Sequence, residues 1–180
     1  MQYSIRLATR DDVPAIELLI ARSIRALGSG DYTSPQIEAA LTGAFGVDTQ
    51  LIADRTYFVV VSSDRVLGCG GWSKRRTLFG NDAHSERDAR ELDPHNDPAK
   101  IRAFFVDPDC ARQGIGTTLL THCEAAARSF GFTAFELMAT LPGVRLYQAR
   151  GYIPGTAILH PLGDDLSIEF VPMRKTDCGG

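Results

Sequence analysis

A pair of glycines at the predicted start of a helix is the feature of this chain best suited to binding a phosphate. The segment 111–116, with Gly114 and Gly116, lies between a strand that ends at Val106 and a helix that begins near Ile115. The first N–H groups of a helix have no intrahelical partner, and the helix dipole adds partial positive charge there. Because glycine lacks a Cβ atom, an anion could approach the backbone closely. The same glycines could instead only shape a tight turn.

A Rossmann dinucleotide site is the main alternative for this turn. Glu136 follows Gly116 by 20 residues, close to the spacing at which an acid contacts a ribose. However, Leu119 replaces the third glycine of the G-x-G-x-x-G pattern, and several residues separate Val106 from Gly114. The preceding strands also favour antiparallel pairing. The pattern therefore argues against a Rossmann fold.

Two segments resemble motifs of the GCN5-related N-acetyltransferase (GNAT) family. Residues 101–120 resemble motif A, in which a strand, a glycine-rich turn and a helix hold acyl-CoA, and residues 146–152 resemble motif B. The resemblance covers most of the chain, with one departure: the Gln or Arg that commonly stands three residues before the first glycine is Ala111 here. It implies a GNAT-like acyl-CoA N-acyltransferase fold of the α+β (three-layer α/β) class, with about six or seven strands in a mixed twisted sheet and about four helices.

The resemblance also implies how acetyl-CoA is bound. Backbone groups of Phe105 and Val106 are expected to pair with the pantetheine arm as a neighbouring strand would. A backbone N–H near Val106 is expected to polarise the thioester carbonyl. The residues expected around the pyrophosphate are Arg112, Gln113, Gly114, Ile115, Gly116 and Thr117. No metal is expected.

Tyr147 is the predicted catalytic residue, because the family places a tyrosine at this position of motif B. A phenol with a pKa near ~10 could protonate a departing thiolate with a pKa of about 8.5. Without the resemblance, a packing role would be favoured. Candidates for a general base are Glu136, on an apolar strand, and His84, in a polar segment. Both are also compatible with ordinary paired or exposed residues, and loss of the amine proton to water requires no base.

Residues outside the two motifs are expected to recognise the acceptor. The helices before residue 45 and the segment 74–99 are the expected sources. Trp72 could form a wall of the acceptor pocket or belong to the core. Lys74–Arg76 could receive an acidic acceptor or simply be solvated, and Arg150 could contact a CoA phosphate or lie on the surface.

Periodicity and cap residues predict the elements that position these groups. Glycine stops are expected at Gly28 and Gly131, and Ser34 is expected to be the N-cap of the second helix, with Pro35 at its first helical position. The predicted helices run to Leu27, to about Ala44, from Ile115 to Phe130 and from Pro142 to Ala149, and the predicted strands are Tyr3–Leu7, Tyr57–Val61, Val66–Ser73, Ile101–Val106, Ala134–Ala139 and Leu166–Met173. These elements would form a single N-acetyltransferase domain over residues 1–175, followed by a tail over residues 176–180.

Composition limits the remaining possibilities. The chain has 180 residues, 44% hydrophobic residues and a formal net charge of -3, so nucleic acid and an anionic membrane are not expected partners. Its four cysteines lack metal-binding spacing, the alternating pattern of Met1–Thr9 is not the one expected of a signal peptide, and no segment approaches about 18 consecutive apolar residues. We expect a cytoplasmic enzyme that transfers the acetyl group of acetyl-CoA to a small-molecule or peptide amine by direct attack in a ternary complex. A non-catalytic acyl-CoA binding or sensing domain is the alternative, and a homodimer is compatible with either.

Overall fold

A computed structural model describes residues 2–63, 65–77 and 90–177. The strands are β1 (Ser4–Leu7), β2 (Tyr57–Ser62), β3 (Arg65–Ser73), β4 (Ala99–Val106), β5 (Ala134–Thr140), β6 (Ile153–Pro154), β7 (Ile158–Gly163) and β8 (Leu166–Thr176). The α-helices are α1 (Val13–Leu27), α2 (Ser34–Thr42), α3 (Thr49–Ala53), α4 (Ile115–Phe130) and α5 (Val144–Ala149). Short 3-10 turns, η1 (Arg10–Asp12), η2 (Pro108–Cys110) and η3 (Leu141–Gly143), lead into or connect these elements.

The sheet confirms the expected α+β fold class. Its order is β1-β2-β3-β4-β5-β8-β6, with β7 paired to β8, and every pairing is antiparallel except that of β4 with β5. Within the described residues the sheet has eight strands, compared with the six or seven expected, and there are five α-helices. The elements that were not expected are α3, with five residues, β6, with two, and β7, with six.

The parallel pair β4–β5 separates along its length. Its register covers only Ala99–Ile101 against Phe135–Leu137, although the strands continue to Val106 and Thr140. Ala103, with φ +54°, interrupts the regular backbone just beyond the paired stretch. One edge of the second half of β4 is therefore not paired with β5, which leaves backbone groups available to a ligand.

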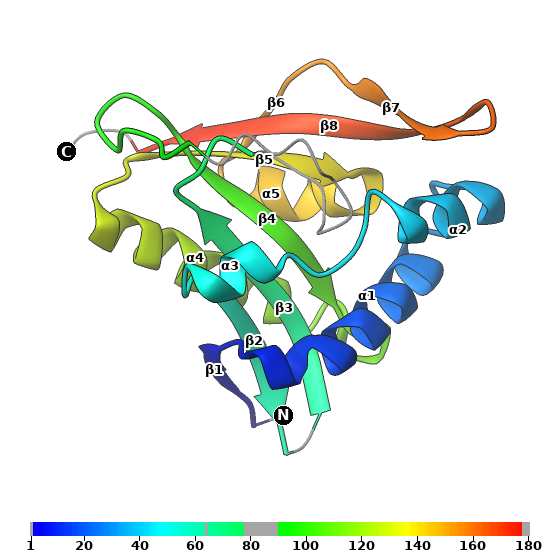
Figure 1. Cartoon of the computed structure of the whole chain (residues 1–180), viewed down its shortest axis with the longest axis horizontal. Helices are drawn as coiled ribbons and strands as arrows, with labels where there is room; N and C mark the ends of the chain where they lie inside the picture. Colours follow the sequence, from blue (N-terminus) through cyan, green and yellow to red (C-terminus); the bar gives the residue numbers. More distant parts are fainter. Residues whose placement is uncertain (1, 64, 78–89, 178–180) are drawn as a thin grey trace.

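Two hydrophobic cores cover opposite faces of the sheet. Helices α1, α2 and α3 contribute Ile16, Ile37 and Leu51 to one core. Helices α4 and α5 pack on the other face, with Leu119 at the centre of that core. Figure 1 shows α1, α2 and α3 on one side of the sheet and α4 and α5 on the other. The predicted cofactor motifs thus lie on one face and the predicted acceptor helices on the other.

One predicted helix start was wrong by a single residue. The side chain of Thr33, not that of Ser34, caps α2, and it accepts a hydrogen bond from the backbone N–H of Gln36. The Gln36 side chain in turn accepts a hydrogen bond from the Thr33 N–H at 2.8 Å, which completes a capping box.

Candidate active site

The opening between β4 and β5 continues into a cleft of about 700 Å³. Its walls come from α1, the end of β4, the turn before α4, η3 and α5. The sequence-predicted site residues that line it are Phe105, Val106, Arg112, Gly114, Gly116, Thr117 and Tyr147. Gln113 and Ile115 are not among the lining residues: Gln113 is exposed and donates a hydrogen bond to the Asp109 carbonyl, whereas Ile115 is buried in the core.

The turn before α4 has the backbone shape expected of an anion site. Arg112 and Gly114 both have left-handed backbone conformations, with φ +64° and φ +87°. Gly114 is the N-cap of α4, no side chain caps the helix, and a Cβ on Gly114 would meet nothing within 4 Å. The end of α4 is therefore open to a ligand, and its unpaired N–H groups and helix dipole favour an anion. The strained conformation of Arg112 is of the kind often found at ligand sites.

Gly116 brings the start of α4 close to α5. A Cβ on Gly116 would lie 3.2 Å from the Leu146 Cδ2 atom, so a larger residue would require the Leu146 side chain to shift. Leu146 lies next to Tyr147, so the glycine turn and the predicted catalytic residue are positioned against one another.

Tyr147 is enclosed by aromatic rings. It is 7% exposed, and its ring centroid lies 6.4 Å from that of Phe104 and 5.7 Å from that of Tyr152, both in edge-on geometry. Burial raises the pKa of the Tyr147 hydroxyl, because the phenolate form would lose its hydration. The hydroxyl therefore stays protonated at neutral pH, as a general acid requires.

A second, smaller cavity of about 70 Å³ lies beside the cleft. It shares four residues with the cleft: Phe104, Phe105, Thr140 and Tyr147. Residues 44–46, which follow the end of α2, also line it. The ring of Phe45 packs edge-on against Phe105 at 5.9 Å and against Phe170 at 6.0 Å.

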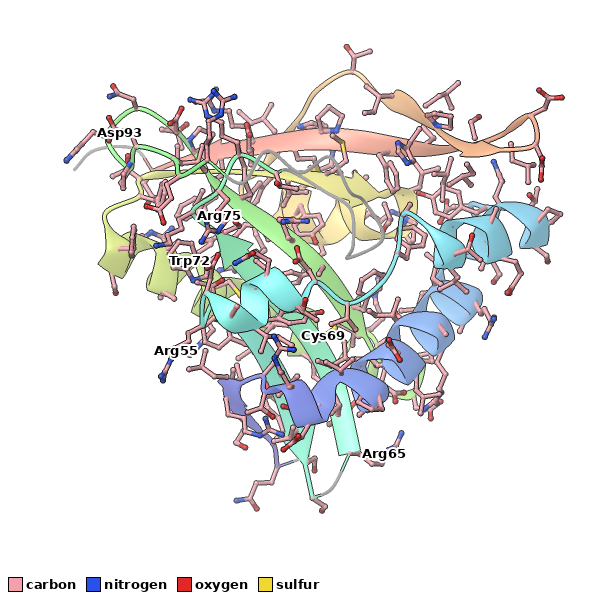
Figure 2. The ribbon with its side chains drawn as sticks, viewed as in Figure 1. Arg55, Arg65, Cys69, Trp72, Arg75 and Asp93 are labelled. Atoms are coloured by element: carbon pink, nitrogen blue, oxygen red, sulfur yellow. The ribbon has the colours of Figure 1, made fainter. Side chains whose placement is uncertain are left out.

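Residues after β4 fix the turn to the rest of the protein. Asp107 is 2% exposed, and its Oδ2 accepts from Arg22 of α1 at 3.0 Å and from Arg65 of β3 at 3.1 Å. Its Oδ1 accepts from the Asp109 N–H at 3.0 Å. Figure 2 shows Arg65 at the start of β3. One buried carboxylate thus joins α1, β3 and the segment that leads into the glycine turn.

Several sequence candidates lie away from the cleft. Glu136 forms an ion pair with Lys100 within the paired part of β4 and β5. Trp72 packs in the core against Phe130 and Phe132, near the end of β3 that lies away from Arg65 (Figure 2).

Two residues of the basic segment Lys74–Arg76 form ion pairs. Lys74 pairs with Glu91 at 2.8 Å, and Arg75 pairs with Asp54 at 2.7 Å. Arg150 is exposed and does not line the cleft. His84 lies outside the described residues.

Sequence reasoning missed Arg145, Thr140 and three residues of α1 that line the cleft: Ser23, Ile24 and Leu27. A signal existed for Ser23, because this serine interrupts the buried apolar stripe of α1. Among the described residues, no group of three or more His, Cys, Asp or Glu side chains could hold a metal ion. None of the described helices has the length and apolar character needed to cross a bilayer.

Comparisons with known proteins identify the family and agree with the fold. The model of the acetyltransferase (GNAT) family matches residues 25–152. A GCN5-related N-acetyltransferase structure from Rhodopseudomonas palustris is similar at a TM-score of 0.71 and 17% identity, over 98% of this chain and 96% of that one. PaiA N-acetyltransferase from Thermoplasma acidophilum, in complex with coenzyme A, has a TM-score of 0.65 at 14% identity, over 98% and 99% of the two chains. The ribosomal-protein-S18-alanine N-acetyltransferase from Escherichia coli has a TM-score of 0.62 at 17% identity, over 99% and 97%. No curated protein sequence matches the chain.

Proposed function

The chain belongs to the acetyltransferase (GNAT) family, and from this premise we propose that it transfers the acetyl group of acetyl-CoA to an amine by direct attack in a ternary complex. The observation that carries the proposal is the position of Tyr147, which lines both the cleft and the smaller cavity. A group at this junction can reach a thioester entering from one side and an amine entering from the other. We also propose that the protein acts in the cytoplasm, as expected from its sequence.

The cleft fits acetyl-CoA in shape and in chemistry. The pyrophosphate lies at the N-terminus of α4, where Gly114 leaves room and the backbone N–H groups are free. Arg112 and Arg145, which line the same cleft, supply positive charge near the phosphates. The pantetheine arm runs along the edge of β4 that is not paired with β5. The coenzyme A complex of the PaiA protein supports this assignment of the ligand.

The proposed reaction forms one C–N bond and breaks one C–S bond. The acceptor amine attacks the thioester carbonyl and loses a proton to water, the departing thiolate takes a proton from Tyr147, and Tyr147 regains a proton from water before the next turnover. The raised pKa of Tyr147 keeps that proton in place until the thiolate develops. The thiolate is equally poorly hydrated in these apolar surroundings, which raises its proton affinity as well.

Calorimetric titration with acetyl-CoA tests the cofactor assignment. Gly114→Glu places a side chain and a negative charge where the pyrophosphate is expected, so affinity is expected to fall at least about 100-fold. Gly163→Glu is the matched control, because Gly163 also has a positive φ, +91°, and open space around it, but lies at the β7–β8 turn. Binding by the wild type and the control, but not by Gly114→Glu, supports the proposal. A wild type that does not bind refutes it.

Release of free thiol from acetyl-CoA in the presence of a panel of amines tests catalysis. The panel contains amino acids, polyamines and peptides, because the acceptor is not identified. Amine-dependent release of thiol is expected. Tight binding without release for any amine would support the acyl-CoA binding or sensing domain instead.

A further inference from the structure

Ser23 is a buried polar residue on an otherwise apolar helix face. The buried residues of α1 are Ile16, Leu19, Ile20, Ser23 and Ile24. Ser23 is 4% exposed and lines the cleft next to Ile24 and Leu27. An alanine at this position would have a higher helix propensity and no polar group to bury. The fold alone therefore does not account for a hydroxyl at this point.

The Ser23 hydroxyl makes no hydrogen bond to any residue that the structure describes. Other serines near helix ends donate to a carbonyl of the preceding turn: Ser29 donates to Ala26 at 3.1 Å and Ser129 to Ala125 at 3.0 Å. Ser23 lines the cleft, so its hydroxyl lies within reach of a ligand there. Once a ligand displaces water from the cleft, this hydroxyl needs a new hydrogen-bond partner, which a polar group of the ligand can supply.

The neighbouring contacts place Ser23 opposite the end of β4. Arg22, the preceding residue, pairs with Asp107 at 3.0 Å, and Asp107 directly follows Val106. Phe105 and Val106 line the same cleft as Ser23. The cleft wall formed by α1 thus faces the strand edge along which the pantetheine arm is expected to run.

The pantetheine arm carries two secondary amides, and both need partners once they leave water. The backbone of β4 can pair with amide groups on one side of the arm only. The other residues of α1 that line the cleft, Ile24 and Leu27, are apolar. We propose that the Ser23 hydroxyl hydrogen-bonds an amide of the pantetheine arm and thereby sets the affinity for acetyl-CoA. This inference rests on the proposed function.

The test compares Ser23→Ala with wild type in two measurements. Removal of one neutral hydrogen bond is expected to weaken acetyl-CoA binding by about 3- to 10-fold in calorimetry. The thermal midpoint of the ligand-free protein is expected to stay the same or to rise, because the hydroxyl has no hydrogen-bond partner among the residues that the structure describes. A serine that only stabilised the fold would instead lower the midpoint. Ser23→Thr retains the hydroxyl and is expected to restore binding, and Ser29→Ala is the matched control.

A fragment of the cofactor makes the test specific. Adenosine 3′,5′-diphosphate lacks pantetheine, so its affinity is expected to be the same for wild type and Ser23→Ala. If Ser23→Ala weakens the binding of both ligands, or of neither, the assignment of Ser23 is wrong, while the acetyl-CoA site stands. If the wild type binds neither ligand, the proposed function itself fails.

Discussion

The ring of Phe104 lies directly over Gly70, so that a Cβ atom on Gly70 would be 2.5 Å from the Phe104 Cδ2 and Cε2 atoms. Phe104 also lines the cleft and the smaller cavity, and it packs edge-on against Tyr147. A glycine of β3 thus determines where an aromatic wall of the candidate site lies.

Gly70→Ala is therefore expected to displace Phe104. Overpacking of this kind costs about 1–3 kcal/mol, and acetyl-CoA turnover is expected to fall more than stability alone explains. Chemical denaturation and steady-state kinetics measure the two effects. Gly30→Ala serves as control, because a Cβ there would meet nothing within 4 Å. Full activity of Gly70→Ala would show that the position of Phe104 is unimportant.

Tyr147→Phe is expected to lower kcat by about 100- to 10,000-fold, the usual contribution of a general acid. The affinity for acetyl-CoA should change little, because the ring and its contacts with Phe104 and Tyr152 remain. Since burial raises the pKa of Tyr147 above its ordinary value, loss of its proton should not limit the wild-type rate up to about pH 10. Pre-steady-state kinetics and a pH profile test both points. An unchanged kcat would leave Tyr147 with a packing role only.

Asp107→Asn removes the charge shared by Arg22 and Arg65. Both arginines are about half exposed, so the expected loss of stability is about 1–3 kcal/mol, less than for a fully buried pair. Acetyl-CoA affinity is also expected to fall, since Asp107 holds the segment that enters the glycine turn. The neighbouring Asp109→Asn, at a side chain that is 67% exposed, is the control and should have little effect on either quantity. Equal effects of the two variants would argue against a positioning role.

The pH dependence of stability has an identifiable source at the start of α1. Two hydrogen bonds from Arg6, at 2.7 and 2.8 Å, lower the pKa of Asp12 to about 2, and bonds from Thr9 add to this effect. The folded-state pKa lies below the unfolded value of about 3.9, so the contribution of Asp12 is present above about pH 4 and is lost as the pH falls towards about 2.

At neutral pH, the ionised Asp12 side chain is expected to contribute about 2 kcal/mol to the free energy of unfolding. The difference in unfolding free energy between wild type and Asp12→Asn should therefore be large at pH 7 and small near pH 2. Asp11→Asn, at an exposed neighbouring position, should show no comparable trend. A difference that does not depend on pH would mean that Asp12 stabilises the protein through something other than its charge.

Local signals made much of the fold predictable. Gly28 and Gly131 end their helices as expected, and the turn with Gly114 leads into α4 where the glycine pattern placed it. Strands β6 and β7 were missed because pairing with β8, rather than an alternating pattern, defines them. In β7, Ile158 and Leu159 are 40% and 68% exposed, so hydrophobicity there does not indicate burial.

The candidate site was predictable only where it is continuous in sequence. Motif A and motif B contain the turn and Tyr147, and both could be located from residue spacing and resemblance. Ser23, Thr140 and Arg145 reach the cleft from separate elements, which only the folded arrangement brings together. Glu136 attracted attention as an acid among apolar residues, but the parallel register of β4 and β5 supplies its partner, Lys100.

The two hydrophobic cores have a consequence for protein engineering and for divergence. The glycine turn and α5 rest on one core, whereas α1, α2 and α3 rest on the other, and the sheet separates the two. Substitutions on distant, independent sites combine additively. Helix α1 lines the cleft, whereas none of the residues described as lining it comes from α2 or α3. A library confined to α2 and α3 is therefore expected to vary the opposite face without rebuilding the site for the activated acyl group.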